Sequence, residues 1–271
     1  MKKGFLYFST VACAITLLAG CMSTAPKMGG GQGGGTITGG AGGANTDNKN
    51  SQLESCDKTL GTMSVFEDRS LPWWSMYQRR APDLGSTVPV IRLMIQQSNC
   101  FVVVERGAAM AAMKAERELM SSGESRGGSN FGKGQMVAAD YTLSPSIQFS
   151  EKGTGGIGAI AGALFGSVGA AVAGGFKKNE AATTMLLIDN RSGVQVSAAV
   201  GNAENQDFRI GGALFAGALL GAGAYSNTPE GKIVTAAFAD SYNQMVKALR
   251  NYKAQQVEGG LGTGGKLGVQ Q

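Results

Sequence analysis

Histidine is absent from this sequence of 271 residues. Without an imidazole, the chain can form neither a Ser-His-Asp triad nor a Cys-His pair, and it cannot bind a metal through histidine. Most hydrolase mechanisms are thereby excluded. We therefore expect a protein without catalytic residues, without a metal site and without a cofactor.

The excess of positive over negative charge is also small. The 24 Lys and Arg residues and the 19 Asp and Glu residues give a formal charge of only +5. Removal of the leader described next takes away Lys2 and Lys3 and leaves +3. Because this excess of positive charge is so small, we expect no nucleic-acid partner.

The sequence begins with a leader. Two lysines precede an apolar run from Phe5 to Leu18, and the residues Leu-Ala-Gly-Cys end at Cys21. This run is short of the roughly 20 residues that a transmembrane helix needs. The pattern is typical of a lipoprotein signal peptide over residues 1–20, with Cys21 as the lipidated first residue. An ordinary secretory leader, in which Cys21 is incidental, is the alternative.

Composition divides the rest of the chain. Met22 rather than Asp follows the lipidation candidate, so nothing signals retention at the inner membrane. We expect a lipid-anchored protein of the outer membrane that faces the periplasm. Glycine accounts for 43 residues, more than twice the average usage of roughly 7%. Polar, Gly-rich stretches predict a flexible tether over residues 21–52 and a flexible tail over 254–271, on either side of a folded domain over 53–253.

Cys56 and Cys100 would be the only thiols of the mature chain, because Cys13 leaves with the leader and Cys21 carries lipid. Two thiols in an oxidising compartment favour a disulfide bond. Each cysteine stands just before an expected strand, and adjacent strand starts could bring the two within bridging distance. Two buried free thiols are the alternative.

The domain reads as an α/β fold, a mixed α+β sheet with flanking helices. Alternating or β-branched runs predict strands, and apolar residues at helical spacing predict helices. The aromatic and basic stretch 71–82 is expected to be a loop. The expected strands are 60–66, 101–104, 139–149, 182–189 and 194–200, and the expected helices are 88–97, 108–120 and 232–252.

Two apolar, Gly-rich insertions interrupt this domain, at residues 153–176 and 209–226. Small residues recur in them every four positions, which is typical of helices that approach each other closely. We expect a membrane-inserted or oligomer-lining pair of helices; buried soluble helices or disordered insertions are the alternatives. The glycines of this predicted glycine zipper are Gly158, Gly162, Gly166, Gly217 and Gly221.

Two glycine motifs resemble phosphate-binding loops but do not support a nucleotide cofactor. Residues 153–158 fit G-x-G-x-x-G, a match that chance explains in a chain so rich in glycine. Residues 127–133 resemble a Walker A motif, but Gly134 stands where the Ser or Thr for Mg²⁺ belongs. Carboxylates such as Glu105 stand close to Arg or Lys, so we expect ion pairs rather than an acid-base dyad.

Four segments carry a family resemblance through their order along the chain, over roughly residues 60 to 252. They are GTMSVFEDRS from Gly61, CFVVVERGAAMAAMKAERELM from Cys100, AADYTLSPSI from Ala138 and MLLIDNRSGVQVSAAVG from Met185. This order resembles the CsgG/HfaB family, outer-membrane lipoproteins associated with curli and holdfast export.

The resemblance implies a periplasmic α/β domain that assembles into a ring. It also implies that two excursions from each subunit build a transmembrane β-barrel through which export proceeds by diffusion. The Gly-rich insertions fall where the family has these excursions. Their four-residue repeat differs from the apolar and polar alternation of barrel strands, so helices and strands both stay open.

The resemblance further implies that residues 71–80 correspond to the loop that narrows the channel. Trp73, Trp74 and Tyr77 would then face the pore. The alternative is that these aromatic side chains pack on their own subunit or at a subunit contact, where Trp and Tyr are generally enriched.

We therefore expect a non-enzymatic, ring-forming component of an apparatus that exports curli, another surface fibre or a polypeptide. Its partners would be the membrane that holds its lipid anchor, further copies of itself and the exported polypeptide or fibre subunit. The alternative is a periplasm-facing scaffold lipoprotein, anchored or clustered by the glycine zipper, that conducts nothing.

Overall fold

A computed structural model describes residues 51–126, 133–149, 181–203 and 228–252, with Gly40, Gly128, Tyr225 and the short stretches 255–257 and 267–269. We call residues 150–180 the first excursion and residues 204–224 the second excursion. Several predicted sites lie outside the described residues, namely Cys21, Gly158, Gly162, Gly166, Gly217 and Gly221.

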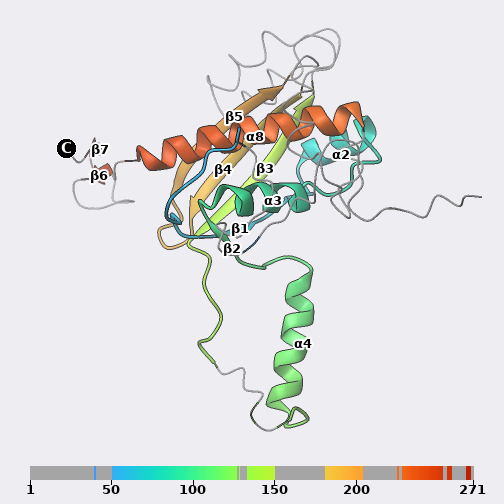
Figure 1. Ribbon diagram of the computed structural model, residues 1–271, viewed down its shortest axis with the longest axis vertical. Coiled ribbons are helices and arrows are strands. Elements are labelled where there is room, and N and C mark those ends of the chain that lie inside the picture. Colours follow the sequence, from blue (N-terminus) through green and yellow to red (C-terminus); the bar gives the residue numbers. More distant parts are fainter. Residues whose placement is uncertain are drawn as a thin grey trace, which may run out of the picture. The chain divides into compact units, whose positions relative to one another are not determined.

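A five-stranded sheet forms the centre of the fold, in the order β2-β1-β3-β4-β5 (Figure 1). β1 pairs in parallel with both β2 and β3, whereas β3, β4 and β5 follow one another antiparallel. The sheet is therefore mixed, as the sequence predicted. Its strands are β1 (Thr62–Val65), β2 (Val102–Val103), β3 (Tyr141–Phe149), β4 (Ala181–Asp189) and β5 (Gln195–Ala203).

One face of the sheet is covered by α3 (Val88–Ser98) and α8 (Pro229–Arg250), which also contact each other (Figure 1). The strand residues on this face are alternate ones, such as Leu143, Ile147 and Phe149 of β3, and they are buried. Burial of these side chains against the helices forms the apolar core, since each apolar Å² removed from water stabilises the fold by roughly 25 cal/mol.

Local signals explain where α8 begins and ends. The side chain of Thr228 accepts a hydrogen bond from the backbone N–H of Gly231 at 3.0 Å, and Pro229 occupies the first turn. Lys247 and Arg250 lie in the last turn, where positive charge interacts favourably with the helix dipole. The apolar stripe alone predicts this helix over 232–252, and the cap at Thr228 with Pro229 explains why it begins one turn earlier.

The expected helix over 108–120 is confirmed as α4 (Ala109–Ser121), which buries none of its residues. The other strands and helices predicted for the domain outside its two Gly-rich insertions are confirmed with small shifts of their ends, whereas the predicted pair of zipper helices lies outside the described residues. Among the described residues, none of the helices combines the length and the apolar character needed to cross a membrane.

Two expectations differ from the structure. The predicted loop 71–82 is mostly a helix, α2 (Pro72–Arg80), which begins with proline and ends with two arginines. Both features are typical of helix ends, and they outweigh the irregular composition of this stretch. The predicted tail contains two short antiparallel strands, β6 (Gln255–Val257) and β7 (Leu267–Val269). Backbone pairing needs no large apolar side chain, so composition did not reveal it.

Candidate functional site where two excursions leave the sheet

Three of the four ends of the excursions are attached to one end of the sheet. Phe149, the last residue of β3, pairs with Ala181, the first residue of β4. Ala181 also pairs with Ala203, the last residue of β5. The chain leaves for the first excursion after Phe149 and for the second after Ala203, so backbone pairing fixes three of the four ends side by side.

The fourth end is Tyr225, where the chain returns from the second excursion toward α8. Its side chain is only 1% exposed. The Tyr225 hydroxyl is hydrogen-bonded to the Tyr77 hydroxyl of α2, and it lies 3.2 Å from the carbonyl oxygen of Gly85. A buried aromatic side chain, rather than the sheet, holds this end of the excursion.

Tyr77 also contacts the end at which the first excursion begins. Its ring stacks on Phe149, with ring centroids 6.3 Å apart and planes within 2° of parallel. Its hydroxyl donates to the Gly85 carbonyl at 2.9 Å. Tyr77 is fully buried, and this burial raises its pKa, while burial and the adjacent Tyr77 raise the pKa of Tyr225. Both phenols therefore stay protonated at neutral pH and serve as donors.

The three aromatic residues that the resemblance assigned to a pore are now placed. Trp73 is 5% exposed and Tyr77 fully buried, so both belong to the core of their own subunit. Packing of these rings on their own subunit is the arrangement that the alternative interpretation describes, and the role of this segment in a pore stays a prediction. Trp74 is half-buried, and the guanidinium of Arg69 lies 4.6 Å from the centre of its ring.

Glu67 fixes the chain on both sides of α2. Its carboxylate is 3% exposed and accepts hydrogen bonds from the Thr87 backbone N–H at 2.8 Å and the Thr87 hydroxyl at 2.7 Å. The Ser86 hydroxyl donates at 3.0 Å and Arg69 Nε at 2.9 Å. Glu67 follows β1 and Thr87 precedes α3, so this carboxylate joins the two chain ends that flank the aromatic helix.

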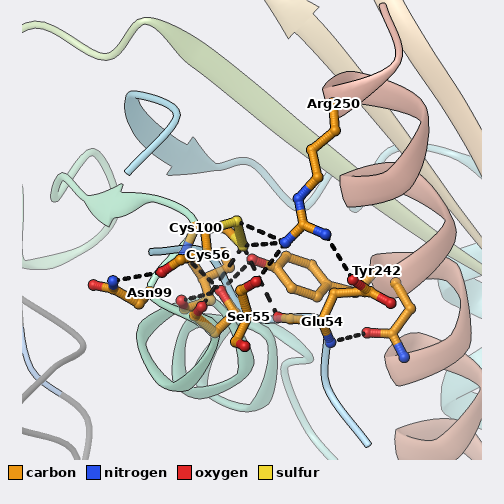
Figure 2. The surroundings of a disulfide bond; sticks show 10 residues. Glu54, Ser55, Cys56, Asn99, Cys100, Tyr242 and Arg250 are labelled. Carbon is orange, nitrogen blue, oxygen red and sulfur yellow. Dashed lines mark hydrogen bonds and ion pairs between the residues drawn. A yellow bond between two sulfur atoms is a disulfide. The ribbon is translucent and has the colours of Figure 1, made fainter. Parts of the chain in front are cut away.

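A disulfide bond between Cys56 and Cys100 lies elsewhere in the core, with the two Cα atoms 4.8 Å apart (Figure 2). Arg250 of α8 donates to Cys56 Sγ at 3.2 Å and to a carboxylate oxygen of Glu54 at 2.8 Å. Asn99 Nδ2 donates to the Cys56 carbonyl oxygen at 2.7 Å. The disulfide thus fastens the start of β2 to the segment that precedes β1.

We call residues 52–56 the strap, since they run from the predicted tether into the domain. Asn243 of α8 donates through Nδ2 to the Gln52 carbonyl at 2.7 Å, and its Oδ1 accepts from the Glu54 N–H at 2.8 Å. The Lys247 ammonium lies 3.4 Å from the Glu54 carboxylate. Together with the disulfide, these contacts hold the strap to α8 and β2.

A pocket of about 520 Å³ lies between the strap, α8 and the end of β5. Asp240 accepts a hydrogen bond there from the Asn202 backbone N–H at 3.1 Å. The pocket is therefore polar on one side and adjoins the start of the second excursion. It is lined by Gln52, Asn202, Ala203, Ala236, Ala239, Asp240 and Asn243.

Glu105, like Glu54 and Glu67, takes part in a structural contact. Arg92 binds both carboxylate oxygens of Glu105, at 2.5 and 3.1 Å, and this hydrogen bonding lowers the Glu105 pKa. Within the part of the chain that the structure describes, no group of three or more His, Cys, Asp or Glu side chains could hold a metal ion. Among the described residues, the contacts of this site join and position chain segments.

Sequence reasoning did not identify Tyr225, Glu67 or Arg250 as members of these clusters. Tyr225 counted only as part of a Gly-rich insertion, although an aromatic residue at the end of such a run signals a point of attachment. No local pattern marks the other two residues, because their partners are distant in the sequence.

Comparison with known proteins covers the whole described domain. A family model described as the curli production assembly/transport component CsgG matches residues 33–270. The matched range includes the strap, all five strands of the main sheet and both excursions. No curated protein sequence matches the chain.

Proposed function

Since the chain belongs to the CsgG family of curli production assembly/transport components, we propose that it is a ring-forming subunit of an outer-membrane apparatus that exports a fibre subunit or another polypeptide. The family belongs to secretion and transport rather than to enzymes. The substrate of this apparatus would be the exported polypeptide or fibre subunit, and its partners would be further copies of this protein.

The observation that carries the proposal is the gathering of the excursion ends at one end of the sheet. Backbone pairing places Phe149, Ala181 and Ala203 side by side on adjacent strands. Tyr225 is hydrogen-bonded to Tyr77, whose ring stacks on Phe149. Each subunit would then send two segments away from the domain at the same place. In a ring of identical subunits, symmetry would bring all these segments to one rim.

The composition of the excursions supports the same function. No Asp, Glu, Lys or Arg occurs between residues 153 and 176 or between residues 210 and 224. Charged side chains are costly inside a bilayer, so their absence over these lengths fits segments that enter lipid or line an oligomer. Charged residues flank both segments, at Lys152 and Lys177 and at Arg209.

The N-terminal region supports attachment to a membrane. Cys21 would carry the lipid, residues 21–52 would form the tether, and the strap would fix the tether to the domain. Lipid attached through a tether holds a subunit near the bilayer without dictating its orientation, which the excursions would then set.

Cell fractionation followed by particle imaging tests this proposal. The full-length protein, extracted from the outer membrane with detergent, should form closed rings of several copies. A matched sample of Cys21→Ser tests whether lipid is needed to reach that membrane. Extraction of the wild-type protein as a monomer would overturn the ring, and its recovery in the inner membrane would overturn the location.

A further inference from the structure

We infer that Tyr77 is a positioning residue that locks the ends of the two excursions into one arrangement, so that α2 couples the excursions to each other. This inference rests on the proposed function, because it assigns a role to the residue that joins the ends of the two excursions to the core of the subunit.

The contacts form one continuous series that runs from Ala203 to Tyr225. On one side, the sheet links Phe149 to Ala181 and Ala181 to Ala203 through backbone pairing. On the other side, Tyr77 links Phe149 to Tyr225 through a stacked ring and a hydroxyl contact. Without Tyr77, the return point of the second excursion at Tyr225 would lose its link to Phe149, after which the first excursion begins.

The hydroxyl groups of Tyr77 and Tyr225 do more than fill space in the core. Two phenol hydroxyls contact each other, and both contact the Gly85 carbonyl. Because each hydroxyl carries one proton, one of them donates to the other, and the other donates to Gly85. Phe at both positions would fill similar volume without burying polar atoms, so a buried polar pair here specifies one arrangement rather than adding bulk.

Tyr77 is itself held firmly, which coupling requires. Its ring centre lies 5.5 Å from that of Trp74 and 6.2 Å from that of Trp73, both on the same helix. The Ala81 N–H at the end of α2 donates to the Tyr77 carbonyl oxygen at 2.8 Å. Because the Tyr77 side chain is packed against its own helix, a shift of Phe149 or of Tyr225 would move α2. The helix would then transmit that shift to the other excursion end.

Spin labels on the residues that directly follow Phe149 and Tyr225 test the inference. The labelled protein carries Ser150→Cys and Ser226→Cys, and it is co-expressed with an excess of unlabelled chain so that each oligomer holds one labelled subunit. Pulsed electron resonance then gives the distribution of distances between the two excursion ends. The test variants are Tyr77→Phe and Tyr225→Phe.

Tyr242→Phe is the matched control. Tyr242 is also fully buried and hydrogen-bonded, with its hydroxyl 2.6 Å from Ser98 Oγ near the disulfide (Figure 2). We expect a narrow distribution in the wild type and in Tyr242→Phe, and loss of the narrow distribution in Tyr77→Phe and Tyr225→Phe. Equal broadening in all three variants, or in none, would overturn the coupling role.

Imaging of the same samples separates this inference from the proposed function. If the wild-type protein forms rings but Tyr77→Phe leaves the distance distribution unchanged, the coupling fails and the proposed function stands. If the wild-type protein forms no rings, the proposed function fails whatever the labels report.

Discussion

Gly201 of β5 lies directly against Ala237 of α8. A Cβ atom built on Gly201 would be 2.2 Å from the Ala237 carbonyl oxygen and 2.2 Å from the Ser241 nitrogen. Both contacts are with helix backbone, which cannot rotate away as a side chain can. Glycine at this position therefore permits the helix and the strand to pack, just before the second excursion begins.

We accordingly expect Gly201→Ala to destabilise the domain by about 2 kcal/mol or more, since overpacking a core typically costs roughly 1–3 kcal/mol. Asn202→Ala is the matched control, because its side chain is exposed on the same strand and its backbone N–H keeps the bond to Asp240. Urea unfolding measures both variants. If the urea midpoint of Gly201→Ala equalled that of the control, α8 would have to lie farther from β5 than the contacts of Gly201 indicate.

Removal of the disulfide should weaken the attachment of the strap. The bond joins residues 44 apart in sequence, and closure of such a loop contributes roughly 4 kcal/mol on the chain-entropy model. The double variant Cys56→Ala and Cys100→Ala should lower the free energy of unfolding by about that amount. Asn243→Ala, which removes two hydrogen bonds to the strap, should cost only about 1–3 kcal/mol.

Mass spectrometry of unreduced peptides should recover Cys56 and Cys100 in one cross-linked species. Both thiols recovered free from protein isolated without reductant would contradict this bond. So would a wild-type unfolding midpoint that a reductant leaves unchanged.

Stability should fall in acid through two carboxylates. Hydrogen bonds from the Thr62 backbone and hydroxyl lower the pKa of Asp140, and hydrogen bonding by Arg92 lowers that of Glu105. A carboxyl group whose pKa is lower in the folded than in the unfolded state stabilises the native protein at pH values above its unfolded pKa. The unfolded pKa is roughly 3.9 for Asp and 4.3 for Glu. This stabilisation is lost as the pH falls through the folded pKa values.

Unfolding of Asp140→Asn and wild-type protein in urea, from neutral pH down to about pH 2, checks this expectation. The variant should be less stable at neutral pH, and the difference should shrink as the solution is acidified below about pH 4. A difference that stays constant over this range would mean that the Asp140 charge has no part in stability.

Lipidation should depend on Cys21 alone. The sequence Leu-Ala-Gly-Cys that ends there is typical of a lipoprotein cleavage site. Cells fed a labelled fatty acid should incorporate it into the wild-type chain and not into Cys21→Ser. Cys56 and Cys100 serve as internal controls, since their alanine variants should keep the label. Equal labelling of Cys21→Ser would contradict the anchor.

The regular elements could be predicted from sequence because their signals are local. A β-branched run indicated the strand around Val103, and the apolar stripe at helical spacing indicated α8. α2 was mistaken for a loop because its tryptophans and arginines give no clear apolar stripe, and because its first turn holds no acidic residue. The four-residue spacing of its two buried rings, Trp73 and Tyr77, was the signal available.

The site itself was less predictable because its contacts join distant parts of the chain. Tyr77 and Tyr225 are 148 residues apart, and Arg250 and Glu54 are 196 apart. No short-range pattern encodes such pairs. The two excursions stay a prediction from composition, since glycine content and the lack of charge over residues 153–176 can be read from the sequence, but these residues lie outside the described ones.

Electrical recording from the purified, full-length ring in a planar lipid bilayer tests the transport role most directly. The account predicts discrete steps of ionic current that scale with the number of rings added and are absent with buffer and detergent alone. Rings that imaging shows to be intact but that never carry current would contradict it. They would favour the alternative of a scaffold lipoprotein that clusters at the membrane without conducting.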